Sequence, residues 1–343
     1  MRAGTRRERR SNGPLLDLPA RSNLRPRWAS LLAPGLLAAV LAAGPAPATQ
    51  STRSPTNLHI SAWVEGADSQ SPDGLRAEDF QVKIDGKPAA VRAVQAPGDD
   101  MVILLVLDLT ADLSLAGLAK ESLVSETEAL PPNILVAVLH AQNGMQVVLD
   151  PAADRQQIRQ AVEGLPISGN AGLLDTVETA VQLADAMVRK SGVRTAVFYV
   201  TDSDVRNYRE DYTNPVINTS DDRDISRRFP EGLIKEKVAK LQSQLQPFHV
   251  PLFLVHLEYR RDRLNEAYQA GLQQLAEESG GSGAFCRSRA EIAQAIQQTL
   301  RRVASLYLLS VPVVKPASRT VQLTVESSGH LLHYRSRFSL GSK

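Results

Sequence analysis

Residues 102–114, "VILLVLDLTADLS", place oxygen-bearing side chains directly after an apolar run, with Asp108, Thr110 and Asp112 at alternate positions. Asp202 follows a second apolar run, "VFYVT". In an open parallel sheet, ligands bind in the crevice beyond the carboxyl ends of the strands. Carboxylate and hydroxyl oxygens are suitable ligands for Mg²⁺ or Mn²⁺. We therefore expect Asp108, Thr110, Asp112 and Asp202 to lie at one edge of a sheet, and we call these four residues the crest.

The hydrophobic period of the sequence changes near residue 99, upstream of the crest. Continuous apolar runs of strand length occur at 101–108, 134–140, 145–150, 195–202 and 250–257. Such runs indicate strands buried on both faces, which are typical of a mostly parallel sheet covered by helices. Apolar residues at three- and four-residue spacing predict the covering helices at 115–130, 173–190, 233–245 and 264–279. The fold class is therefore α/β, Rossmann-like and doubly wound.

Two local signals refine this α/β region. Asn143-Gly144 is a hairpin dipeptide, so one edge strand is expected to be antiparallel. Asp150 precedes a helical pattern and is expected to cap that helix. The polar stretch from Ser203 to Pro230 is expected to be a long surface loop beside the crest, where such loops are commonly functional.

Short strands flank the α/β region on both sides, with Asp85-Gly86 as a hairpin signal in the first flank. We expect the two flanks to pair with each other into a small β unit. The predicted organisation is a signal segment at 1–48, a linker at 49–57, an N-terminal β segment at 58–98, an α/β domain at 99–304 and a C-terminal β segment at 305–343.

The N-terminal region has the pattern of a secretory signal with a long basic leader. An apolar run from Trp28 to Ala43 follows a basic flank and precedes Ala46-Pro47-Ala48, a small-x-small cleavage site. The run is shorter than the roughly 20 residues that a spanning helix needs. We expect cleavage after Ala48 and an extracytoplasmic location: periplasm, cell envelope or secreted. An uncleaved segment would instead tether the protein to a membrane.

Composition excludes several classes of protein. The chain has 39 basic and 37 acidic residues, which does not favour a nucleic-acid binder. The single cysteine, Cys286, excludes an internal disulfide framework and is expected to be buried. No glycine-rich nucleotide-binding motif follows a strand, and no two histidines have ligand spacing on a helix, so we expect no small-molecule substrate.

The pattern resembles a von Willebrand factor A (VWA) domain, most closely the bacterial secreted variety in which that domain lies between short β segments. The family's metal-ion-dependent adhesion site (MIDAS) uses Asp-x-Ser-x-Ser after the first strand, a Thr before a helix and an Asp after the fourth strand. The matching positions here are Asp108-Leu-Thr110-Ala-Asp112, Ala171 in "GNAGLLDTV", and Asp202. The stretches "LRAEDFQVKIDGK", "LAEESGGSGAF" and "SLYLLSV" extend the resemblance over nearly the whole mature chain.

This resemblance implies a non-enzymatic module for adhesion or assembly that binds a protein partner of unidentified kind. It also implies a divalent cation, Mg²⁺ or else Mn²⁺ or Ca²⁺, held by Asp108, Thr110, Asp112 and Asp202. The chain departs from the pattern at two positions, because Asp112 replaces a neutral hydroxyl and Ala171 replaces a hydroxyl with a methyl. Three carboxylates within about 5 Å repel by roughly 1 kcal/mol per pair even in water, so either a cation binds or one Asp turns away.

Two alternatives remain open from the sequence. One is a metal-free structural scaffold of the cell envelope. The other is a haloacid-dehalogenase-like phosphohydrolase, with Asp108 as the nucleophile and Thr201 as a second-motif hydroxyl. The enzyme would also need a close acidic pair after a later strand, and Glu258 and Asp262 do not form one in the sequence.

Overall fold

The computed structural model describes residues 56–65, 74–110, 112–205, 230–313 and 320–339. The expected signal segment at 1–48, residues 49–55 of the expected linker, and residues 206–229 of the expected polar loop lie outside the described residues. Within the described part of the chain, every helix is too short or too polar to cross a membrane.

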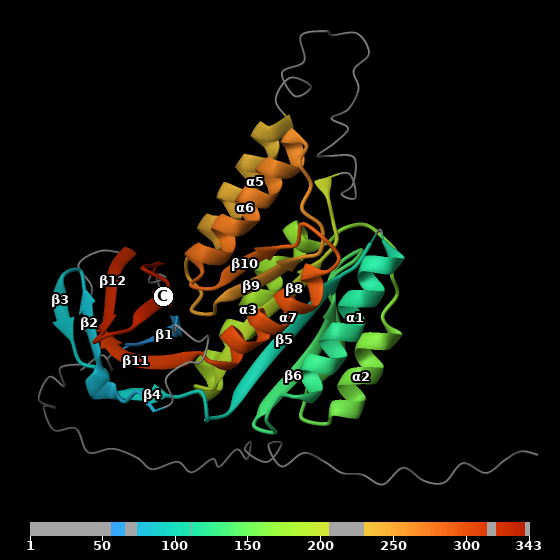
Figure 1. Ribbon diagram of the computed structural model, residues 1–343. Helices are drawn as coiled ribbons and strands as arrows, with labels where there is room; N and C mark the ends of the chain where they lie inside the picture. The colour runs from blue at the N-terminus through green and yellow to red at the C-terminus, as the bar shows by residue number, and fades with distance from the viewer. Residues whose placement is uncertain (1–55, 66–73, 111, 206–229, 314–319, 340–343) are drawn as a thin grey trace, which may run out of the picture. The chain divides into compact units, whose positions relative to one another are not determined.

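A six-stranded sheet forms the centre of the α/β domain, in the order β10-β9-β8-β5-β6-β7 (Figure 1). The strands are β5 (Met101–Asp108), β6 (Ile134–His140), β7 (Gln146–Ala152), β8 (Arg194–Thr201), β9 (Leu252–His256) and β10 (Ser282–Phe285). All neighbours are parallel except β6 and β7. The chain builds the sheet outward from β5 in one direction, and then from β8 in the other. This confirms the doubly wound α/β class.

The antiparallel edge strand is also confirmed. Asn143 and Gly144 have φ values of 57° and 111°, the left-handed region that a tight hairpin between β6 and β7 requires. The expectation for Asp150 is wrong, because β7 continues to Ala152 and Asp150 lies within it. Asp154 caps α2 (Arg155–Gly164) instead, accepting hydrogen bonds from the backbone N–H groups at the start of that helix.

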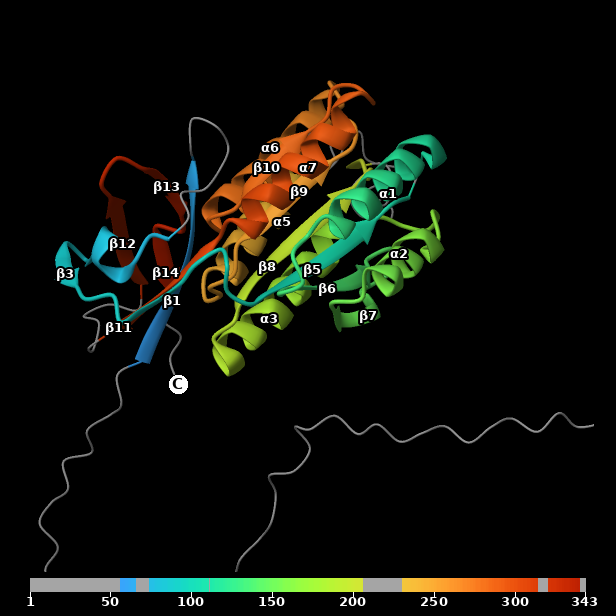
Figure 2. The same ribbon diagram turned by 60° about the horizontal axis from the view of Figure 1, so that its bottom comes forward.

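Helices cover both faces of the central sheet (Figure 2). One face carries α1 (Leu113–Glu128), α2 (Arg155–Gly164) and α7 (Glu291–Ala304), and the other carries α3 (Leu173–Ser191), α5 (Pro230–Leu245) and α6 (Arg263–Glu278). Along β5, Ile103 and Leu105 pack under the first group of helices, whereas Leu104 and Val106 pack under the second. Burial on both faces explains why the strand is apolar without alternation.

The flanking segments form two four-stranded antiparallel sheets, in the orders β13-β1-β11-β4 and β14-β12-β2-β3. The strands are β1 (Thr56–Glu65), β2 (Phe80–Ile84), β3 (Lys87–Ala89), β4 (Ala93–Gln95), β11 (Tyr307–Val313), β12 (Thr320–Ser327), β13 (Leu331–Tyr334) and β14 (Arg337–Ser339), with a 3₁₀ helix, η1 (Ala77–Asp79), before β2. Strands β1 and β11 pair over seven residues, and β2 pairs with β12. The N- and C-terminal segments therefore share one apolar core, as the sequence predicts.

A buried arginine joins this β unit to the α/β domain. Arg194 is 1% exposed at the start of β8. Its guanidinium donates to the carbonyls of Pro97, at 2.8 Å, and Asp99, which precede β5. It also donates to the carbonyls of Ala304, at 3.2 Å, and Leu306, at 2.9 Å, which follow α7. The chain passes between the β unit and the α/β domain at these two segments, and the Arg194 side chain binds both of them.

Candidate functional site

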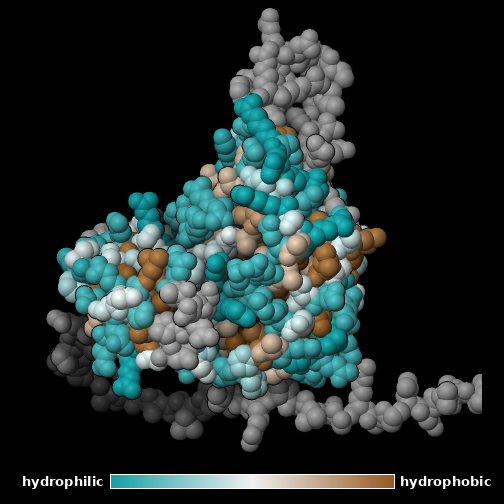
Figure 3. Space-filling view, viewed as in Figure 1, coloured by the Kyte–Doolittle hydropathy of each residue, from teal (hydrophilic) through white to brown (hydrophobic). Residues whose placement is uncertain are grey.

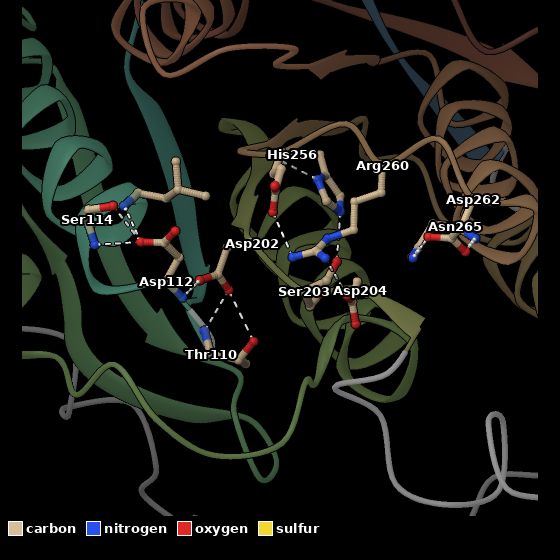
Figure 4. Close-up of polar contacts among 12 residues, drawn as sticks. Thr110, Asp112, Ser114, Asp202, Ser203, Asp204, His256, Arg260, Asp262 and Asn265 are labelled. Carbon is tan, nitrogen blue, oxygen red and sulfur yellow. Dashed lines mark hydrogen bonds and ion pairs between the residues drawn. The ribbon is translucent and has the colours of Figure 1, made fainter.

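The crest lies where the strand order of the central sheet reverses. Asp108 ends β5 and Asp202 immediately follows β8, and these strands are parallel neighbours with Asp108 in register with Thr201. Thr110 and Asp112 lie in the segment between β5 and α1. The structure thus brings the four predicted residues together at the crevice where open α/β sheets bind ligands. Figure 4 shows Thr110, Asp112 and Asp202 in contact.

Asp108 is fully buried, and its carboxylate accepts hydrogen bonds from backbone N–H groups at the start of α3. Its Oδ1 accepts a hydrogen bond from Gly172 N at 3.0 Å, and its Oδ2 accepts from Leu173 N and the Thr201 hydroxyl, both at 3.2 Å. Burial raises the pKa of Asp108 to about 6, although these hydrogen bonds oppose the shift. A Cβ atom at Gly172 would lie 1.8 Å from the carbonyl oxygen of Ala141, so only glycine permits this close approach.

Asp202 clamps the segment that follows β5. Its Oδ1 accepts from the backbone N–H of Thr110 at 2.6 Å and from the Thr110 hydroxyl at 3.2 Å. Its Oδ2 accepts from the backbone N–H of Asp112 at 3.1 Å. Since Asp202 is 2% exposed, the carboxylate faces the protein rather than solvent.

Asp112 turns away from the other two carboxylates and caps α1. Its Oδ1 accepts from Ser114 N at 2.8 Å, Ser114 Oγ at 2.6 Å and Leu115 N at 3.2 Å. Its Oδ2 lies 3.5 Å from Nη2 of Arg289. The Ser114 hydroxyl, the two backbone donors and Arg289 lower the pKa of Asp112.

The described arrangement does not fit a divalent cation. Every carboxylate oxygen of the three aspartates faces an N–H or O–H donor, and Ala171 contributes only a buried methyl group. Among the residues that the structure describes, no three His, Cys, Asp or Glu side chains form a group that could hold a metal ion. The cation predicted from the sequence therefore stays a prediction, without support from this geometry.

A second polar group beside the crest was not predicted from the sequence. His256 ends β9, and its ring Nε2 lies 2.8 Å from the carbonyl oxygen of Ser203. Burial lowers the pKa of His256 to about 4, so the ring is neutral and donates this hydrogen bond. Nη1 of Arg260 lies 3.1 Å from Oδ2 of Asp204 (Figure 4). Its Nη2 lies 2.7 Å from Oε2 of Glu258. The signal that could have found the group is its position, since residues 256–260 follow the strand next to β8.

The crest does not present a reactive carboxylate. Asp108 is 0% exposed and both its oxygens hold hydrogen bonds, so a phosphate ester could not reach it in this arrangement. Two hollows of about 430 Å³ each lie away from the crest. One is lined by residues of α1 and α2, and the other lies beside Gln95 and Val193. This geometry does not favour the phosphohydrolase alternative.

An exposed apolar side chain borders the crest. Leu113, the first residue of α1, is 72% exposed directly after Asp112. The face drawn in Figure 3 is mostly hydrophilic, and its apolar side chains lie in small, separate groups. The other large exposed apolar residues of the described chain are Leu118, Val147, Val148 and Leu331. Cys286 is buried, as predicted.

Comparisons with known proteins bear on the fold. No protein-family model and no curated protein matches the chain. The structure is similar to a von Willebrand factor type A protein from Catenulispora acidiphila, with 12% identity and a TM-score of 0.43 over 85% of this chain and 74% of that one. It is also similar to BatB from Bacteroides thetaiotaomicron, with 16% identity and a TM-score of 0.36 over 60% of this chain and 98% of that one.

A third similar structure is proximal thread matrix protein 1 from the mussel byssus, in a form with a zinc-occupied MIDAS motif. The identity is 11% and the TM-score 0.40, over 64% of this chain and 49% of that one, so this chain spans about half the length of the mussel protein. At such identities the likeness concerns the fold alone. The α/β domain is Rossmann-like and doubly wound, as its own strand order and helical layers show.

Proposed function

We propose that this chain is an exported, non-enzymatic protein-interaction module of the VWA type, which serves adhesion or assembly and contacts a protein partner at the solvent-facing side of the crest, where Asp112 and the neighbouring Leu113 and Arg289 reach solvent. One observation carries the proposal. The strand order reverses between β5 and β8, and this places polar side chains from two strand ends and one helix start at a single edge.

The surroundings of the crest support binding to a protein rather than to a small molecule. The exposed Leu113 lies next to charged groups that reach solvent, including Asp112 and Arg289. Apolar anchors within a polar rim are typical of protein–protein interfaces.

Export is proposed from the sequence pattern alone, since residues 1–55 lie outside the described part of the chain. N-terminal sequencing of the protein from an extracytoplasmic fraction should begin near Thr49. An intact Met1 terminus in a cytosolic fraction would contradict export.

The module does not depend on the cation predicted at Asp108, Thr110, Asp112 and Asp202.

Site-specific photocrosslinking tests the binding surface. A photoreactive amino acid replaces Leu113 at the crest or, as a matched control, Leu331 on β13, which is 62% exposed. Both variants are incubated with the envelope fraction of the source cell. We expect a discrete crosslinked protein from position 113 that excess unlabelled wild-type protein competes away. Equal capture from position 331, or none from position 113, would contradict a partner surface at the crest and favour the scaffold alternative.

A further inference from the structure

We infer that the crest keeps its shape without a divalent cation, because hydrogen bonds and the guanidinium of Arg289 satisfy the carboxylates that a cation would otherwise hold. The inference deepens the proposed function, and its consequence for binding rests on that function: a protein partner would engage the crest even in the presence of a chelator.

Both oxygens of the Asp202 carboxylate accept hydrogen bonds from the segment that follows β5. An ionised carboxylate only accepts hydrogen bonds, at about four lone-pair positions. Three donors from Thr110 and Asp112 occupy three of these positions at 2.6, 3.2 and 3.1 Å. The Thr110 hydroxyl donates its hydrogen to the same carboxylate. The segment after β5 is therefore pinned to the end of β8 by the protein itself.

Asp112 is committed to α1. Its carboxylate accepts from Ser114 and Leu115, as an N-cap side chain does. The positive end of the helix dipole favours its negative charge there. Drawing Asp112 toward a cation would leave these donors without their acceptor.

Arg289 supplies the positive charge in place of an ion. It lies in the segment between β10 and α7, and its Nη2 is 3.5 Å from Oδ2 of Asp112. A guanidinium stays charged under all working conditions. The other arginine of this segment, Arg287, lies over the ring of Tyr259, with its Cζ 5.9 Å from the ring centroid, and provides a matched control.

The remaining family position also offers no ligand. Ala171 is 6% exposed and presents a methyl group where the family pattern has a threonine hydroxyl. Asp108 is directed at the backbone N–H groups of Gly172 and Leu173. Both oxygens of the Asp108 carboxylate therefore hold hydrogen bonds to the start of α3, and Ala171 has no side-chain oxygen.

Thermal melting of the purified full chain tests the inference, in EDTA and in millimolar Mg²⁺, Mn²⁺ or Ca²⁺, for wild type and Asp202→Ala. A cation at a hundredfold excess over its dissociation constant would raise the Tm by roughly 5 to 10 °C. We expect no such rise. A rise that persists in Asp202→Ala would place the ion elsewhere and also agree with the inference. A rise in wild type that Asp202→Ala abolishes would overturn it.

The role of Arg289 is tested by charge reversal. Arg289→Glu places a second carboxylate beside Asp112, so we expect its Tm to fall about 1 to 3 °C below that of Arg287→Glu at low salt, with the difference shrinking as salt screens the charges. An equal or smaller fall for Arg289→Glu would overturn the assignment.

Photocrosslinking from position 113 separates this inference from the proposed function. Capture of the same protein with and without EDTA is expected. Capture that requires a cation would overturn the inference while leaving the partner surface in place. Absence of any capture would instead remove the proposed function, and the melting result would still decide whether the crest holds a cation.

Discussion

Replacing Arg194 with methionine should weaken the whole chain, because four backbone carbonyls from two distant segments depend on its guanidinium. Burial lowers the pKa of Arg194 to about 10, so it remains charged at neutral pH. A hydrogen bond from a charged group contributes about 1.5 to 3 kcal/mol. Removing a buried charge recovers part of its desolvation cost, so we expect a net loss of about 3 to 5 kcal/mol in the free energy of unfolding.

Urea unfolding followed by circular dichroism measures this loss, with Arg287→Met as the control. Arg287 is exposed, and its substitution should change the free energy of unfolding by less than about 0.5 kcal/mol. In thermal melts the Arg194→Met variant should lose roughly 10 °C, since about 1 kcal/mol corresponds to 2 to 4 °C in a chain of this size. A loss below about 1 kcal/mol would show that water replaces the guanidinium at these carbonyls and would refute the reasoning.

Three further predictions concern the crest and its supports. Gly172→Ala should destabilise the protein by about 2 to 3 kcal/mol, because its Cβ would lie 1.8 Å from the Ala141 carbonyl oxygen. The control Gly117→Ala, in α1 with open space around it, should stabilise the protein by about 0.5 to 1 kcal/mol in the same urea assay. The pKa of His256 falls from 6.5 to about 4 on folding, so its stabilising contribution is full above pH 6.5 and is lost as the pH falls toward 4. Between pH 7 and 4.5, the free energy of unfolding of His256→Gln should therefore fall by about 2.5 kcal/mol less than that of wild type. An equal fall in both proteins would contradict a neutral ring. The purified protein should not hydrolyse p-nitrophenyl phosphate, and turnover abolished by Asp108→Asn would favour the phosphohydrolase.

The fold could largely be predicted because its signals are local. Continuous apolar runs marked the strands of the central sheet, and Asn143-Gly144 and Asp85-Gly86 marked two hairpins that the structure contains. The wrong expectation for Asp150 has a local cause too: two aspartates precede the same helix, and the length of β7 decides that Asp154 reaches the helix donors.

The position of the crest was also predictable, but the directions of its side chains were not. That Asp108 and Asp202 lie on adjacent strand ends follows from the strand order. Asp112 was expected as a ligand from the family pattern, although the sequence Asp112-Leu-Ser114 before an apolar helix is itself a cap signal. The roles of Arg194, Arg289 and His256 depend on backbone groups or side chains that are far away in sequence, so no local sequence pattern predicts these roles.

A crystal structure of the purified protein grown with Mn²⁺ shows directly whether the crest holds a divalent cation, because anomalous scattering identifies the ion. We expect no anomalous peak at the crest, with Oδ1 of Asp112 still near the backbone N–H groups of Ser114 and Leu115, and with Asp202 still hydrogen-bonded to Thr110. A peak about 2.1 to 2.2 Å from carboxylate oxygens of the crest, with Asp112 turned away from α1, would contradict it.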